Sequence, residues 1–222
     1  NMEGILEVEK IHDSRYVIGF DPAQGLGQDY SVIVVVRQDS DGFVHFVNMW
    51  RRNDFPPDRQ ADVLIDMIKR YGNAPLAAED VGFQQLYESL LAQKGALVDY
   101  RKSRVSNRVL KQGLMNRLRV WFEREKLIFP YGDDKTRRKV NILFQELETH
   151  AWRDGLIVDL GKHNDAAMAF AHAVDQLQIP QGDVAVAMGS LSGGEWIGGN
   201  KSRGIARKGK LGIGGVIRRR YK

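Results

Sequence analysis

The feature that most constrains the fold is a short apolar run, Tyr16 to Phe20, which ends in Asp21 and is followed at once by Pro22. The run carries no charged side chain and contains β-branched residues, so it is predicted to be a central strand. Pro22 cannot donate a hydrogen bond to a neighbouring strand, and the strand is therefore expected to end there. This places Asp21 at the last rigid position before a loop. An acid at such a position can cap a turn or bind a metal ion, and only the rest of the chain decides between these roles.

The remaining elements are predicted from hydrophobic periodicity, turn residues and helix-capping signals. Strands are expected at 15–20, 31–38, 43–51, 76–80 and 97–100, an extended piece at 127–130, helices at 57–71, 83–93, 108–126, 134–148 and 165–178, and a hairpin at 150–160. This order predicts an α/β fold, in which helices flank a central mixed sheet of five or more strands and a small hairpin is added.

Composition divides the chain into three parts. Residues 1–14 are mixed and charged and are predicted to be a linker, or sequence left from cloning, and residues 15–180 are predicted to form one domain. Residues 181–222 hold eleven of the 23 glycines and a net charge of +7, so we expect a flexible tail or one that a partner orders. There is no cysteine and no apolar run of about 20 residues, which excludes thiolate metal sites and predicts no membrane-spanning helix.

Positive charge in the predicted domain is local. Residues 101–139 contain thirteen basic and four acidic side chains, whereas the net charge of the whole chain is only +5. Such a stripe can bind the phosphate backbone of DNA, although a solvated helix face has the same composition. The candidate DNA-binding residues are Arg101, Lys102, Arg104, Arg108 and Lys111.

Three acids stand at the ends of predicted elements. Asp21 ends the first strand, Glu79 ends the fourth, and Asp165 begins the last long helix. Carboxylates that converge repel one another unless divalent cations bind between them, and Mg²⁺ and Mn²⁺ prefer oxygen ligands. Two such ions can cleave a phosphodiester. Asp80, adjacent to Glu79 and pointing to the opposite face, and Asp29, which equally fits a cap, are further candidate ligands.

The residues around these acids resemble those of a known family. The runs are Gly19-Phe20-Asp21-Pro22-Ala23, Asp29-Tyr30-Ser31, Ala78-Glu79-Asp80-Val81-Gly82 and His163-Asn164-Asp165-Ala166-Ala167. Together they resemble the nuclease domain of the large terminase subunit of tailed bacteriophages, over about Tyr16 to Leu177. The resemblance implies an RNase H-like fold close to that of RuvC-type resolvases. It also implies that Asp21, Glu79 and Asp165 are the catalytic ligands of two Mg²⁺ or Mn²⁺ ions.

The resemblance further implies a metal-dependent endonuclease that cuts concatemeric viral DNA during genome packaging in the cytoplasm of the host cell. The implied partners are double-stranded DNA, the portal and the small terminase subunit, and no membrane is involved. His163 would orient a ligand or the leaving phosphate, or else is an ordinary surface histidine. No G-x-x-x-x-G-K-[ST] loop is present, so the ATPase motor of such a protein is expected to be absent from this chain. A RuvC-like junction resolvase and a non-catalytic DNA- or portal-binding module stay open as alternatives.

Overall fold

A computed structural model of the chain describes residues 4–23, 27, 29–79, 83–103, 108–153 and 156–179. The predicted tail, 181–222, lies outside the described residues. Within the described ranges, every helix falls short of the length and apolar character needed to cross a bilayer.

The centre of the fold is a mixed sheet. Its strands are β1 (Arg15–Asp21), β2 (Ser31–Gln38), β3 (Val44–Arg52), β4 (Leu76–Glu79), β5 (Tyr100–Ser103) and β6 (Leu127–Ile128), in the order β5-β4-β1-β2-β3-β6. β1, β2 and β3 pair antiparallel, whereas β4 runs parallel to both β1 and β5, and β6 runs parallel to β3. The first and fourth strands are therefore neighbours, and their carboxyl ends lie at the same edge of the sheet.

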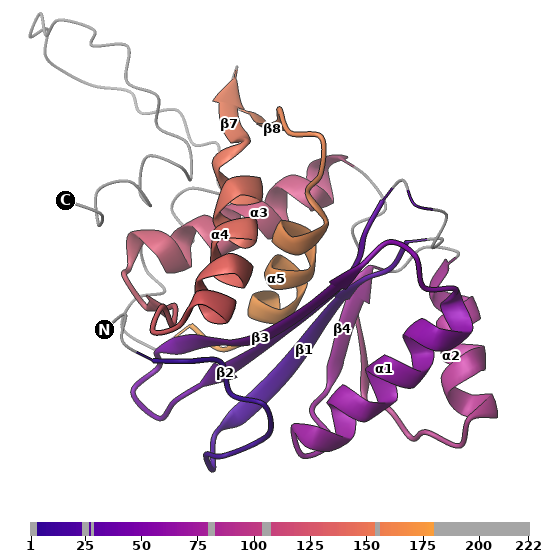
Figure 1. The fold of residues 1–222 in the computed structure, drawn as a ribbon. Coiled ribbons are helices and arrows are strands. Elements are labelled where there is room, and N and C mark those ends of the chain that lie inside the picture. The colour runs from indigo at the N-terminus through magenta and orange to yellow at the C-terminus, as the bar shows by residue number, and fades with distance from the viewer. Residues whose placement is uncertain are drawn as a thin grey trace, which may run out of the picture.

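Helices cover both faces of this sheet (Figure 1). α1 (Pro57–Arg70) and α2 (Phe83–Gln93) pack on one face, and α3 (Arg108–Glu123), α4 (Asp134–Glu148) and α5 (Asp165–Asp175) pack on the other. β7 (His150–Arg153) and β8 (Leu156–Asp159) form a separate two-stranded hairpin. The predicted α/β architecture with its small hairpin is confirmed.

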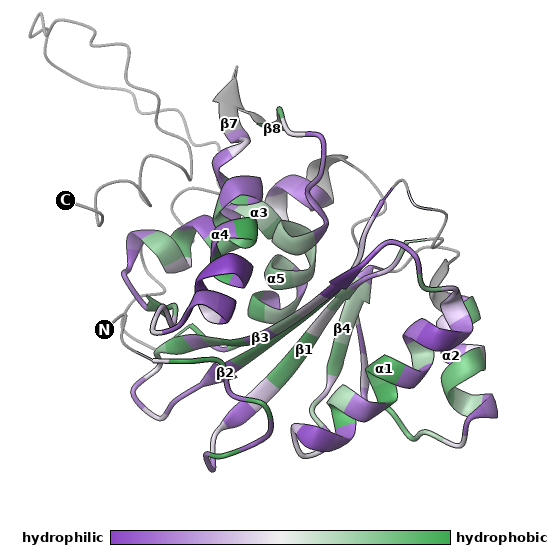
Figure 2. Ribbon diagram, viewed as in Figure 1, coloured by the Kyte–Doolittle hydropathy of each residue, from purple (hydrophilic) through white to green (hydrophobic). Residues whose placement is uncertain are grey.

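Successive residues of the central strands enter two different cores, because side chains of a strand alternate between its faces. In β2, the side chains of Val32, Val34 and Val36 belong to the core under α3, α4 and α5, and those of Ile33 and Val35 to the core under α1 and α2. The central strands are accordingly apolar along most of their length, while the exposed sides of the helices are hydrophilic (Figure 2). Burial on both faces explains why these strands read as continuous apolar runs in the sequence.

One detail of the second half of the sheet differs from the prediction. The fifth strand begins at Tyr100, not at Leu97, because its pairing with β4 starts at Leu76 opposite Tyr100. Leu97 is 98% exposed and contributes nothing to the core. In α2, Leu86 is 41% exposed, whereas Tyr87 and Leu91 are buried in the core under α1 and α2.

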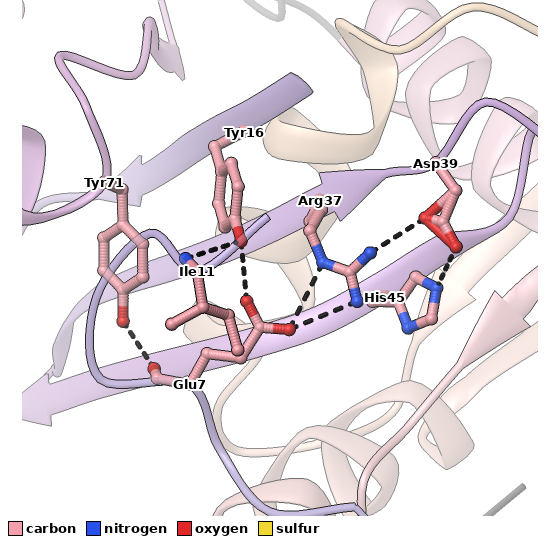
Figure 3. A network of polar contacts seen from close by, with 7 residues as sticks. All are labelled: Glu7, Ile11, Tyr16, Arg37, Asp39, His45 and Tyr71. Carbon is pink, nitrogen blue, oxygen red and sulfur yellow. Dashed lines mark hydrogen bonds and ion pairs between the residues drawn. The ribbon is translucent and has the colours of Figure 1, made fainter. Parts of the chain in front are cut away.

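The segment before β1 packs on the domain, contrary to the prediction of a linker over residues 1–14. Leu6 is buried, and the Glu7 side chain accepts hydrogen bonds from the Tyr16 hydroxyl at 2.8 Å and from Nε of Arg37 at 3.2 Å (Figure 3). The Tyr71 hydroxyl donates to the Glu7 carbonyl at 2.7 Å. These hydrogen bonds hold the segment in place, so the described part of it belongs to the domain.

A strand and a helix approach each other closely at Gly19. A Cβ atom there would lie 1.9 Å from the carbonyl oxygen of Ala169 and 2.8 Å from the amide nitrogen of Ala173, both in α5. Only glycine allows the backbones of β1 and α5 to approach this closely. Gly19 is two residues before Asp21, and Ala169 is one helical turn after Asp165, so this contact fixes the two acids relative to each other.

We predict that Gly19→Ala destabilises the chain by at least about 3 kcal/mol, because the added methyl group overlaps backbone atoms that cannot move without shifting α5. Urea unfolding of the purified variant measures this change. The matched control is Gly113→Ala in α3, where a Cβ would meet only Nη1 of Arg117 at 3.5 Å. That variant gains about 0.5 to 1 kcal/mol, since alanine favours a helix interior. Equal effects of the two substitutions would contradict the close contact.

Candidate metal centre

The structure brings together the three acids that the sequence singled out. Asp21 is the last residue of β1 and Glu79 the last of β4, and the parallel pair Phe20–Ala78 immediately precedes them. Asp165 is the first residue of α5, which packs against β1. Burial raises the pKa of Asp21 well above its ordinary value, and the nearby charges of Asp165 and Glu79 raise it further. The charges of Asp165 and Glu79 therefore both act on Asp21 at this edge of the sheet.

These acids differ from ordinary buried carboxylates in having few hydrogen-bond donors. Within the described residues, the carboxylates of Asp21 and Glu79 have no hydrogen-bond partner, and that of Asp165 accepts one bond, from the amide of Tyr30 to Oδ2 at 3.3 Å. No three acidic or histidine side chains of the described segments already enclose a position for an ion. The donor set nevertheless fits Mg²⁺ or Mn²⁺, because it consists of carboxylate oxygens that lack protein partners and repel one another.

A fourth carboxylate, Glu146 of α4, lies beside this group but has its own partners. Its Oε2 accepts hydrogen bonds from the amides of Ala166 at 2.6 Å and Ala167 at 3.1 Å, and its Oε1 pairs with Nη2 of Arg51 at 3.3 Å. Burial raises the pKa of Glu146, and the two amides and Arg51 oppose that rise. With both oxygens occupied, Glu146 is a structural acid and not a candidate ligand.

The sequence prediction missed Glu146, although the pattern contained a signal. Val140, Leu143 and Leu147 form the buried stripe of α4, and position 146 lies on the same side of the helix, one turn after Leu143. An acid in an apolar stripe is seldom buried unless it has a specific partner.

The sequence prediction missed Arg51 as well. Its guanidinium stacks on the ring of Tyr30, 3.3 Å from the ring centroid, and so supports the loop whose amide holds Asp165.

The loop after Asp21 is held by Gln60 of α1, which is fully buried. Its amide nitrogen donates to the carbonyls of Ala23 at 3.0 Å and Phe55 at 2.6 Å, and its oxygen accepts from the hydroxyls of Ser31 and Tyr87. All four hydrogen-bonding positions of the amide are thus used. This network ties the chain just after β1 to α1, α2 and the start of β2.

The other candidate ligands have varied positions. Asp29 is exposed, but its charge contributes to the raised pKa of Asp165, for which burial is the main cause. Nδ1 of His163 is 3.7 Å from Oδ2 of Asp165, and its ring packs edge-on against Tyr30. His163 therefore lies beside the carboxylates. Asp80 falls outside the described residues.

The predicted DNA-binding residues separate into two groups. Arg101 is exposed on β5 and pairs with Asp99 at 2.7 Å, Lys102 lies in the same strand, and Arg108 begins α3. Lys111, by contrast, lies near the acids: its charge opposes the rise in pKa of both Asp21 and Glu79. Arg104 falls outside the described residues.

His172, inside α5, has the surroundings of a structural residue. It is fully buried in α5, and neither ring nitrogen has a hydrogen-bond partner among the described residues. Burial, with a smaller contribution from the nearby charge of Lys111, lowers its pKa to about 4. The ring is therefore neutral at physiological pH and does not balance the charge of the acids.

We predict that Asp21→Asn stabilises the chain at neutral pH in the presence of EDTA. The pKa of Asp21 is raised in the folded chain, so the folded chain holds the extra proton and wild-type stability falls as the pH rises from about 4 through that pKa. Asparagine removes this penalty. The gain in melting temperature should be largest at pH 8 and should shrink toward pH 4, whereas Asp66→Asn on exposed α1 should change little at either pH. A gain in melting temperature that does not depend on pH would contradict the raised pKa of Asp21.

Comparison with known proteins identifies the family. The family described as "Terminase RNaseH-like domain" matches residues 18–177. No curated protein matches the chain at a significant level.

Solved structures share the fold. The large terminase nuclease of thermophilic phage G20c with bound magnesium is 23% identical, with a TM-score of 0.63 over 80% of this chain and 89% of that chain. The large terminase nuclease domain of Thermus phage P74-26 is 23% identical, with a TM-score of 0.62 over 82% and 94%. The nuclease domain of the large terminase g2p of bacteriophage SPP1 with bound manganese is 14% identical, with a TM-score of 0.57 over 78% and 93%.

The six-stranded mixed sheet with helices on both faces is thus an RNase H-like fold, and the resemblance seen in the sequence motifs is confirmed. The family match covers most of the chain and includes Asp21, Glu79 and Asp165. This chain belongs to the terminase RNase H-like domain family.

Proposed function

We propose that the chain is a metal-dependent endodeoxyribonuclease that cuts concatemeric viral DNA during genome packaging. The observation that carries this proposal is the convergence of Asp21, Glu79 and Asp165, where burial and mutual repulsion raise the pKa of Asp21 and few protein donors oppose the charge. Structures of related terminase nucleases with bound magnesium and manganese support a role for divalent cations.

The three acids are well placed to hold two cations. Asp21 and Glu79 stand on paired strands and are held by the sheet, whereas Asp165 stands on α5, fixed through the Gly19 contact and the Tyr30 amide. Cations bound between them would activate a water molecule and neutralise charge on the cleaved phosphodiester. Lys111 adds a positive charge on the α3 side, where it can attract the DNA phosphate toward the acids.

The remaining roles extend this proposal to partners. The basic residues of 101–108 would hold the DNA backbone without reading its sequence. The tail, 181–222, mixes basic and apolar side chains, which suits a segment that folds on another packaging component such as the portal. The small terminase subunit would be a further partner, and the work would take place in the cytoplasm of the host cell.

We predict that the chain degrades plasmid DNA with Mn²⁺ or Mg²⁺ and that EDTA stops the reaction. Asp21→Asn and Asp165→Asn should each lower the rate by at least about a thousandfold, because each removes a charged ligand while the fold persists. Asp66→Asn, which changes an exposed acid paired with Arg70, is the control and should cleave normally. Wild-type cleavage rates in the Asp21 or Asp165 variant would remove the two-metal mechanism.

Two other outcomes would favour the alternative functions. A chain that binds DNA but no Mn²⁺ would be a non-catalytic module, and a preference for branched DNA would indicate a junction resolvase.

We also predict weak, sequence-independent and steeply salt-dependent binding to duplex DNA. Reversing the charge of Arg101, Arg104 and Arg108 should lower affinity on all sequences alike, and the slope of log affinity against log salt should shrink by about 0.9 for each phosphate that the variant no longer neutralises. Fluorescence anisotropy at several salt concentrations measures both quantities. Arg70→Glu on α1 is the control, since α1 covers the sheet face opposite α3. Selective loss on one sequence would mean that base edges are read here.

A further inference from the structure

The start of α5 lacks the capping arrangement usual for a helix. The first amide groups of any helix have no partner within the helix, and a side chain of the residue just before it commonly accepts their hydrogen bonds. Here that residue, Asn164, makes no capping hydrogen bond with its side chain. The amides that a cap normally serves, at the second and third helical positions, belong to Ala166 and Ala167.

Glu146 takes this role from another helix. Its Oε2 lies 2.6 Å from the amide nitrogen of Ala166 and 3.1 Å from that of Ala167, and its side chain is only 7% exposed. Arg51, 18% exposed, pairs with the other oxygen and keeps the carboxylate from being an isolated buried charge. A negative charge at this position also interacts favourably with the helix dipole.

The arrangement matters because the helix begins with Asp165. A short acidic or amide side chain at a helix start is itself a preferred acceptor for such amides. If Glu146 were absent, the nearest side chains along the chain able to accept these hydrogen bonds would be Asn164 and Asp165. Because Glu146 already occupies the amides, Asp165 keeps one oxygen without a hydrogen-bond donor among the described residues and uses the other for the Tyr30 amide.

We propose that Glu146 is a positioning residue: it caps α5 from α4, so that the Asp165 carboxylate is left available for a divalent cation. This inference rests on the proposed function for the identity of the cation. The capping of α5 by Glu146 does not depend on the proposed function, because it rests on the two hydrogen bonds alone. No electron or proton transfer is assigned to Glu146.

The first experiment measures the capping directly. Amide exchange and NMR shifts of Ala166 and Ala167 are compared in wild type, Glu146→Ala and Glu146→Gln, without metal. Exchange should accelerate in the alanine variant and change much less in the glutamine variant, whose oxygen can still accept both bonds. Unchanged exchange in the alanine variant would overturn the proposal. If that variant does not fold, the glutamine variant decides, since its weaker acceptor must still accelerate exchange at these two amides measurably.

The second experiment measures the consequence for the cation, with Mn²⁺ titrated calorimetrically into each protein. Glu146→Ala should weaken Mn²⁺ binding by about tenfold to a hundredfold, and Glu146→Gln should recover most of the affinity. In cleavage assays the alanine variant should lose kcat while its KM for DNA stays within about twofold of wild type. In an Asp165→Asn background, Glu146→Ala should produce no further loss of Mn²⁺ affinity, because its effect passes through Asp165. If the two substitutions lowered Mn²⁺ affinity additively, Glu146 would not act through Asp165.

Glu7→Ala is the matched control. Glu7 is likewise a largely buried carboxylate, 13% exposed, that pairs with an arginine, Arg37 at 3.2 Å, but it contacts Tyr16 at the end of β1 remote from Asp21 (Figure 3). This variant should lose stability without losing Mn²⁺ affinity, and an equal loss in both variants would reduce Glu146 to a general stabilising role. A wild-type chain that neither binds Mn²⁺ nor cleaves DNA would contradict the proposed function. In that case, accelerated amide exchange in Glu146→Ala would still establish that Glu146 caps α5. The proposed effect of Glu146 on cation binding would be contradicted.

Discussion

The close contact between Gly19 and the backbone of α5 sets how β1 and α5 are placed relative to each other. It brings the end of β1 and the beginning of α5 to one place, since Asp21 and Asp165 stand at short, fixed distances along the chain from that contact. Alanines at 166, 167, 169, 171 and 173 are all buried and give α5 the small side chains that such an approach requires. The alanine-rich composition of this helix is therefore a requirement of packing and not only of helix propensity.

Gathering acids at this contact costs stability, and the fold offsets the cost selectively. The Glu146 carboxylate is bound by two amides and an arginine, and Gln60 donates hydrogen bonds to the carbonyls of Ala23, just after β1, and Phe55. Asp21 and Glu79 are given no such hydrogen-bond partner among the described residues. Two kinds of acid thus lie near this edge of the sheet. Glu146 is stabilised by groups of the protein, whereas Asp21 and Glu79 are available to an added positive charge. This contrast, more than the number of acids, distinguishes a ligand from a structural carboxylate.

Much of this could be predicted from the sequence because it depends on local pattern. The strands buried on both faces, the helix starts and the positions of Asp21, Glu79 and Asp165 all follow from runs of a few residues, whereas α3 ends at Glu123 and α5 at Asp175, three residues before their predicted ends. Features that depend on distant partners could not be predicted. The fifth strand begins where β4 offers a partner, residues 4–11 dock through Glu7, and Glu146 is buried because of amides 20 positions later in the chain. Periodicity marks position 146 as inward-facing but cannot say what it meets there.

The place of α5 in the chain has a consequence for how the protein reaches its native state. α5 lies against β1 and β2, yet it is the last helix of the described chain, and the hydrogen bond from Tyr30 to Asp165 spans 135 residues. Contacts this distant in sequence form slowly, and a chain made from its N-terminus presents the sheet long before the helix that covers it. The part of the apolar face of β1 and β2 that α5 covers can therefore be buried only after the residues of α5 have emerged from the ribosome. Asp21 and Glu79 are synthesised early, whereas Asp165 is synthesised only when the domain is nearly complete. We therefore expect the three acids to come together late in folding.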